Sequence, residues 1–151
     1  DRVAYQLENA GYAGPVRRSA LASGWTDLLD LRMRCDNLDQ FREDPRFASL
    51  AQSAKRIGNI LKDEVPSDHF QASDLAQPEE LALLDHMHRA ESQHDMTVTL
   101  VNLAELAQPL EAFFNAVMVK CEDPVLRAAR LSLLHRLRQA FLRVADFSQW
   151  Q

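Results

Sequence analysis

Apolar and polar positions alternate along most of the chain with the 3.6-residue period of an amphipathic helix. Glycine is rare, β-branched residues are sparse, and Leu, Ala, Gln, Glu and Arg dominate, so the summed propensity favours helix and no sheet is expected. The pattern predicts an all-α fold, a single antiparallel bundle of about seven or eight helices that forms one domain over residues 1–151. The expected helices are at about 1–11, 15–22, 25–42, 45–62, 77–93, 95–107, 109–118 and 124–145.

Prolines mark where several of these helices begin. Pro45 and Pro124 each follow an aspartate, which predicts Asp44 and Asp123 as N-caps with proline at the first helical position. The polar stretch 64–74 contains another proline and is predicted to be a loop. Three further prolines also suit helix starts: Pro15, Pro78 and Pro109.

The predicted helix 45–62 separates into two faces. Lys55, Asn59 and Lys62 lie together on one side, and Gly58, which is unfavourable inside a helix, is expected to let another backbone approach closely. The polar strip is either a solvated face or a surface that contacts phosphates and base edges of a nucleic acid. The apolar face on roughly the opposite side consists of Phe47, Leu50, Ala54, Ile57 and Leu61.

The last predicted helix, 124–145, places an arginine inside its apolar face. Arg130 is expected to be paired or hydrogen-bonded, because breaking a buried ion pair costs about 3–5 kcal/mol. Arg127 and Arg138 lie on the flank, where they can meet either solvent or phosphate. The apolar face itself consists of Leu126, Ala129, Leu133, Leu137, Ala140, Phe141 and Val144.

The formal net charge of −5 argues at first against a nucleic-acid partner. The charge is unevenly spread, however: residues 1–63 carry a net +1, residues 64–111 a net −9 and residues 112–151 a net +3. The net charge of the whole chain therefore does not exclude a surface with one acidic and one basic face, and binding of RNA is not excluded. The acidic middle segment is expected to face away from any RNA.

Composition and cysteine usage narrow the class of protein. An apolar fraction of 46% with 26% charged residues is typical of a globular domain, and no run approaches the roughly 20 apolar residues that cross a bilayer. Cys35 and Cys121 are far apart and show no CxxC spacing, which indicates a reduced, cytoplasmic compartment rather than a disulfide framework.

The sequence contains only fragments of known catalytic and metal-binding motifs. The spacing Glu91-x-x-His94 is one that di-iron bundles use, but such a site needs the motif on two helices, and the looser Asp85-x-x-His88 lies on the same helix. No metal site is expected. GxSxG, P-loop, GxGxxG and HExxH motifs do not occur, so no catalytic residues are expected. The motifs alone therefore predict a binding or scaffold module.

Several stretches resemble the bacterial glycyl-tRNA synthetase beta subunit, in particular its C-terminal anticodon-binding domain of the DALR type. They are residues 55–61 (KRIGNIL), 109–120 (PLEAFFNAVMVK), 122–131 (EDPVLRAARL) and 141–148 (FLRVADFS). The motif that names this domain type is Asp-Ala-Leu-Arg, whereas residues 124–127 here read Pro-Val-Leu-Arg. The resemblance implies an all-helical anticodon-binding domain cut from the C-terminus of a larger beta subunit.

The resemblance also implies a role in glycyl-tRNA aminoacylation. The partners would be tRNA with a glycine anticodon and the synthetase alpha subunit in an α2β2 tetramer, and ATP with Mg would be used by the parent enzyme, not by this fragment. The second and third letters shared by glycine anticodons are cytosines, so an acceptor such as a backbone carbonyl, Asn59 or an acidic side chain is expected near the bound base. The tRNA-binding candidates are Lys55, Arg56, Asn59, Lys62, Arg127, Arg130 and Arg138.

An alternative hypothesis is that the chain is a helical protein-interaction or scaffold module without RNA binding. This alternative predicts exposed apolar area on one face of the bundle, and it predicts that charge reversal at Lys55, Arg56 and Lys62 leaves function intact.

Overall fold

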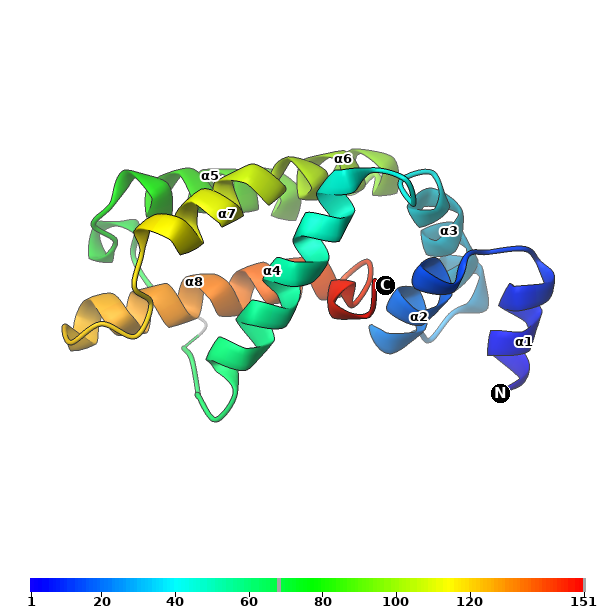
Figure 1. The fold of residues 1–151 in the computed structure, drawn as a ribbon, viewed down its shortest axis with the longest axis horizontal. Coiled ribbons are helices and arrows are strands. Elements are labelled where there is room, and N and C mark those ends of the chain that lie inside the picture. Colours follow the sequence, from blue (N-terminus) through cyan, green and yellow to red (C-terminus); the bar gives the residue numbers. More distant parts are fainter. Residues whose placement is uncertain (68, 151) are drawn as a thin grey trace.

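A computed structural model describes residues 1–67 and 69–150. This part of the chain contains eight α-helices, two short 3-10 helices and no strand, so the predicted all-α class is confirmed (Figure 1). The elements are α1 (Arg2–Asn9), α2 (Gly14–Ala22), α3 (Leu28–Asp39), α4 (Pro45–Leu61), η1 (Ala72–Asp74), α5 (Pro78–Glu91), α6 (Met96–Glu105), α7 (Ala107–Ala116), α8 (Pro124–Leu142) and η2 (Phe147–Gln149).

Local signals account for where the long helices start. The Asp44 carboxylate accepts the backbone N–H of Arg46 at 2.9 Å at the start of α4. The Asp123 carboxylate accepts the N–H groups of Val125 at 3.0 Å and Leu126 at 3.2 Å at the start of α8. Both predicted N-caps are therefore confirmed, each with proline in the first helical turn.

Helices α6 and α7 are separated by Leu106 alone, and both run back along α5 (Figure 1). Pro109 explains the break. It has no N–H to bond the carbonyl of Glu105, and its ring would clash with that carbonyl in a continuous helix. The helix consequently ends at Glu105 and restarts at Ala107, two residues earlier than the proline alone suggested.

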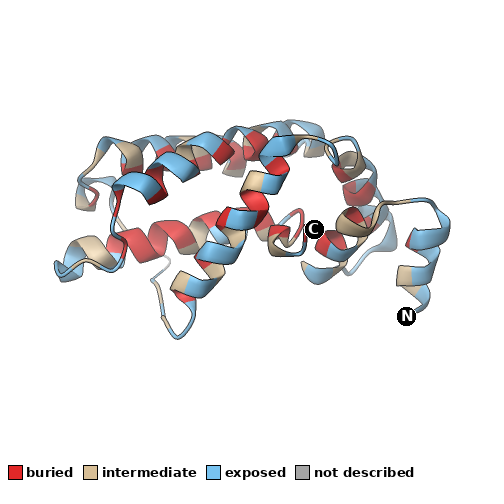
Figure 2. Cartoon of the chain, viewed as in Figure 1, coloured by how far each residue is buried: buried red, intermediate tan, exposed pale blue. Residues whose placement is uncertain are grey.

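Helix α4 crosses in front of α8 rather than lying in series with its neighbours in sequence (Figure 1). It packs mainly against α6, α7, α8 and η2. Consecutive helices pack together at α1 with α2, α2 with α3, α5 with α6 and α6 with α7. The predicted apolar face of α4 is buried at Phe47, Leu50, Ile57 and Leu61, and Ala54 is half-buried (Figure 2).

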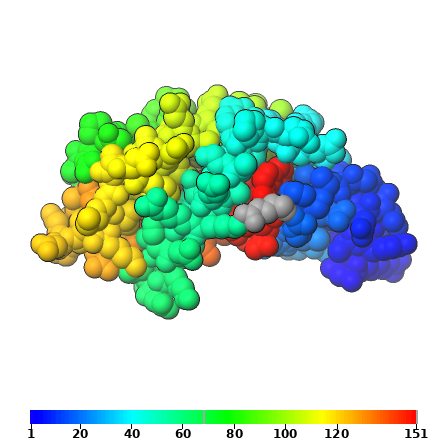
Figure 3. All heavy atoms as spheres, viewed as in Figure 1, coloured from blue at the N-terminus to red at the C-terminus, as the bar shows by residue number. Residues whose placement is uncertain are grey.

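After α8, the C-terminal segment folds back against α4. The ring centroid of Phe47 lies 5.4 Å from the centroids of both Phe147 and Trp150, and Phe141 contacts Phe147 edge-on at 5.6 Å. Figure 3 shows this segment in red at the surface, between α4 and α2. The sequence pattern did not predict η2, which is too short to show a helical period.

A buried arginine, Arg34, joins the N-terminal helices to this segment, which the sequence pattern did not predict. The Arg34 guanidinium donates to the carbonyl of Val144 at 2.7 Å, to the Ser23 hydroxyl at 2.8 Å and to the carbonyl of Gly24 at 2.8 Å. Its Nε also contacts the Asp30 carboxylate at 3.1 Å. Five N–H donors in a fixed fork allow one side chain to bind α2, the turn after it and the chain end together.

Candidate nucleic-acid interface

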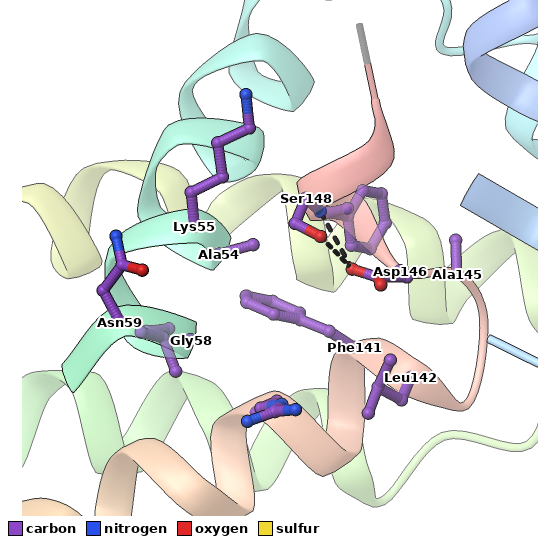
Figure 4. A pocket seen from close by; sticks show the side chains of 12 residues that line it. Ala54, Lys55, Gly58, Asn59, Phe141, Leu142, Ala145, Asp146 and Ser148 are labelled. Carbon is purple, nitrogen blue, oxygen red and sulfur yellow. Dashed lines mark hydrogen bonds between the residues drawn. The ribbon is translucent and has the colours of Figure 1, made fainter. Parts of the chain in front are cut away.

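A surface hollow of about 410 Å³ lies between α4, the last turns of α8 and the C-terminal segment (Figure 4). Three of the predicted candidates line it: Lys55 and Asn59 from α4, and Arg138 from α8. In Figure 4 the Phe141 ring reaches between α4 and the C-terminal segment. The other lining residues are Ala54, Ile57, Gly58, Leu142, Ala145, Asp146, Phe147 and Ser148.

The polar candidates at this hollow are available to a ligand. Lys55, Asn59 and Arg138 are all exposed. None of the ion pairs among the described residues involves Lys55 or Arg138. Two cations without carboxylate partners therefore lie on different walls of one hollow, where each is available to contact an anionic group.

Gly58 forms part of the α4 wall, and its role differs from the one expected. A Cβ placed on Gly58 would have no neighbouring atom within 4 Å, so no other backbone approaches it and that expectation was wrong. The space in front of Gly58 belongs to the hollow. Its missing side chain therefore leaves the hollow wider than any other residue would.

Asp146 also lines this hollow, although the sequence pattern did not predict it as a site residue. Its Oδ1 accepts the backbone N–H of Ser148 at 3.1 Å and the Ser148 hydroxyl at 2.6 Å, and its own N–H donates to the carbonyl of Ser19 at 2.8 Å. The Asp-x-Ser pattern of an N-cap is the one signal that could have drawn attention to it. Its position at the hollow follows from the fold-back of the chain end (Figure 4).

Arg56 and Lys62 lie outside this hollow. The Arg56 guanidinium sits over the ring of Phe114 on α7, 4.4 Å from the ring centroid. Together with Glu111 these two residues line a smaller hollow of about 220 Å³. Lys62 is exposed just after the end of α4. The strip on α4 is thus divided, and only part of it faces the hollow that α8 completes.

Arg127 does not line the hollow and forms an ion pair with Glu64. Its Nη2 lies 3.3 Å from Oε1 of Glu64, and the ammonium of Lys120 lies 3.3 Å from the same oxygen. The hydrogen bond from Lys120, and then the one from Arg127, lower the pKa of Glu64 from its ordinary value. Arg127 therefore connects the start of α8 to the chain that follows α4.

Arg130 is corrected from a tRNA-binding candidate to a core residue. It is 3% exposed, its Nε donates to Oε1 of Glu80 at 2.5 Å, and its Nη1 donates to the carbonyl of Met118 at 2.7 Å. Glu80 is fully buried and also accepts the N–H groups of Ala76 at 2.7 Å and Gln77 at 3.4 Å. The expected pairing is confirmed, and a guanidinium enclosed in this way cannot reach RNA.

The acidic middle segment supplies much of this pairing. Besides Glu80, Glu91 on α5 accepts from Arg136 at 2.9 Å. In Figure 1, α5, which carries Glu80 and Glu91, lies behind α7, whereas α4 crosses in front of α8. Glu111 also belongs to the acidic segment 64–111, but it lies beside Arg56 of α4 and lines the smaller hollow with it.

Comparison with known proteins identifies the family. Residues 50–145 match the DALR anticodon binding domain. The chain belongs to this family. It is 40% identical over 159 aligned positions to the glycine–tRNA ligase beta subunits of Escherichia coli and Shigella boydii, a match that covers 99% of this chain and 23% of each relative. The chain therefore spans about a quarter of the length of the curated relatives it matches.

The family match includes only part of the hollow's wall. Lys55, Asn59 and Arg138 lie within the matched residues, whereas Asp146, Phe147 and Ser148 follow them. In this anticodon-binding domain, the described residues bring no three His, Cys, Asp or Glu side chains into a cluster that could hold a metal ion. Nor does any helix of that part have the length and apolar character needed to cross a membrane.

Proposed function

We propose that this chain is the anticodon-binding domain of the beta subunit of a glycine–tRNA ligase, and that it binds tRNA with a glycine anticodon. In this proposal residues 1–151 form one domain of a longer subunit, which works with an alpha subunit in an α2β2 assembly in the cytoplasm. The ligase uses ATP and Mg to join glycine to its tRNA, and the chemistry takes place outside this chain. The family match and the beta-subunit relatives support the proposal.

The observation that carries the proposal is the hollow with Lys55, Asn59 and Arg138 on its walls. Anticodon bases are unpaired, so proteins bind them by splaying them out, covering their faces and hydrogen-bonding their edges. Lys and Arg contacts to phosphate position the loop, while an amide such as that of Asn59 can contact a base edge. The hollow offers all three kinds of contact at one place on the surface.

Binding of tRNA at different salt concentrations tests the proposal. Lys55→Ala and Arg138→Ala should each weaken binding and reduce the salt dependence of the affinity by about one phosphate contact. Arg89→Ala is the matched control, because it removes the same unit of charge from an exposed site on α5 where Arg89 pairs with Asp85. We expect the control to keep the wild-type salt dependence.

Two results would contradict the proposal. The first is wild-type binding by both hollow variants. The second is equal affinity for tRNA with a glycine anticodon and for tRNA altered at the second and third anticodon letters. The intact ligase should be used alongside the domain, because contacts elsewhere in the subunit add to the affinity.

A protein-interaction surface is the second candidate function, and one observation favours it. Large apolar side chains are exposed on α1, α3 and the turn before α3, with Tyr5 64%, Leu29 68% and Met33 50% exposed. If this were the whole function, Leu29→Glu would disrupt assembly of the ligase subunits while the hollow variants retained normal aminoacylation. Loss of tRNA affinity in the hollow variants would instead support the first proposal.

A further inference from the structure

The walls of the hollow suit a single flat, partly apolar ligand group. Phe141, Ala54 and Leu142 contribute apolar surface, and Gly58 contributes none beyond its backbone. A cavity of about 410 Å³ falls within the range of small-molecule sites, which combine mostly apolar walls with a few placed polar groups. An unstacked nucleobase has this character, because its faces are apolar and its edge is polar.

One polar group at the hollow is held in place with an unused acceptor. Asp146 is anchored by its N–H on Ser19 and by its Oδ1 on Ser148. Among the described residues no donor is bonded to its Oδ2. A carboxylate oxygen that is fixed in position but not satisfied by the protein can accept a hydrogen bond from a ligand.

From this geometry we propose that the hollow takes one unstacked cytosine of the anticodon and that Asp146 accepts a hydrogen bond from the cytosine exocyclic amine. The inference rests on the proposed function and names the base that the site reads. Carboxylates accept from the cytosine amine, whereas uracil presents a carbonyl oxygen at the same position and would be repelled. Asn59 on the facing wall can donate to a ring acceptor of the same base.

The surrounding cations make a carboxylate tolerable at an RNA site. Lys55 and Arg138 line the same hollow and have no carboxylate partner among the described residues. They offset the charge of Asp146 and attract the phosphates on either side of the base. Asp146 therefore determines which base is bound, while the two cations determine how tightly the loop is held.

The test is Asp146→Asn in the full-length subunit that carries this chain, assembled as the ligase. Asparagine keeps an acceptor for Ser148 and is an equally good N-cap, but it can place an amide donor where Oδ2 stood. Affinities are measured for tRNA with the glycine anticodon and for tRNA with uracil at the second or at the third letter. A structural role for Asp146 would not change which base is preferred.

We expect the wild type to prefer cytosine over uracil by about tenfold at one of the two letters. Asp146→Asn should abolish or reverse that preference at this letter and leave the other letter unchanged. The ratio compares two RNAs on the same protein preparation, so a lower folded fraction in the variant cancels. The matched control is Arg89→Ala, which should keep the wild-type ratios at both letters.

Unchanged ratios at both letters in Asp146→Asn would overturn the inference, as would an equal change at both. In either case a wild-type preference for the glycine anticodon would leave the proposed function standing. If the wild type showed no such preference, the proposed function itself would fail. The two failures are therefore distinguished by the wild-type data alone.

Discussion

Replacing Gly58 by alanine separates the stability of the domain from its binding of RNA. Gly58 lies inside α4, and a Cβ at this position would meet no atom within 4 Å. The methyl group therefore causes no clash, and the main change is that the unfolded chain loses conformational freedom. Alanine should raise the free energy of unfolding by about 0.5–1 kcal/mol, which corresponds to about 1–4 °C in Tm for a domain of this size.

The same methyl group projects into the hollow, so tRNA binding should weaken while stability rises. Filling a well-packed contact with an extra carbon costs about 1–3 kcal/mol, so a drop in affinity of about fivefold or more is expected. Urea unfolding followed by circular dichroism measures the first effect, and titration with tRNA measures the second. Gln52→Ala is the control, because Gln52 is exposed on α4 and lines the smaller hollow instead.

Either half of this result can fail separately. A lower Tm for Gly58→Ala would show that another group occupies the space in front of the glycine and would refute the geometry of the hollow. Higher stability with unchanged tRNA affinity would show that no base enters there. Weaker binding by Gln52→Ala to the same extent would mean that any change in α4 perturbs RNA binding.

Three further predictions concern groups away from the hollow. Glu80→Gln should lower the free energy of unfolding by about 3–5 kcal/mol in urea, because it leaves the Arg130 charge buried without a counter-charge; a loss below about 1 kcal/mol would contradict this. Burial raises the pKa of the Cys35 thiol to about 11. A thiol reagent at neutral pH should therefore modify only Cys121 in the native protein and both cysteines after denaturation. Rapid reaction of Cys35 in the native state would refute its burial. The hydrogen bond from Lys120 is the chief cause that lowers the pKa of Glu64 in the folded protein. The Glu64 carboxylate therefore stabilises the fold at pH values above its ordinary pKa of 4.5. This stabilisation is lost as the pH falls through the lower pKa that Glu64 has in the folded state. Unfolding experiments should therefore show a small deficit for Glu64→Gln at neutral pH that disappears in acid, and a deficit that persists at low pH would exclude this cause.

Helix positions could be predicted because their signals are local. Asp123 and the proline after it act on the N–H groups of the next turn, and Pro109 acts on the carbonyl four residues before it. The periodicity likewise identified the buried face of α4, but α8 is also buried at Leu131, Ser132 and Leu134, outside its predicted apolar face. It could not predict that α4 crosses α8, because many arrangements bury the same faces.

The candidate site was only partly predictable for the same reason. Lys55 and Asn59 share a helix face, so their proximity follows from the 3.6-residue period. Arg138 and Asp146 reach the same hollow only because α8 and the chain end fold against α4. Conversely, Arg56 belongs to the same helix but turns to Phe114 on α7.

The sequence by itself determined the helices, their caps, the uneven distribution of charge and the need of Arg130 for a partner. Only the tertiary structure decided that this partner is Glu80, that Arg34 binds the chain end, and that Asp146 stands opposite Asn59 across a hollow. Periodicity and capping act over about four residues, whereas these contacts join groups far apart in the chain. Which groups meet over such distances depends on how all the helices pack at once.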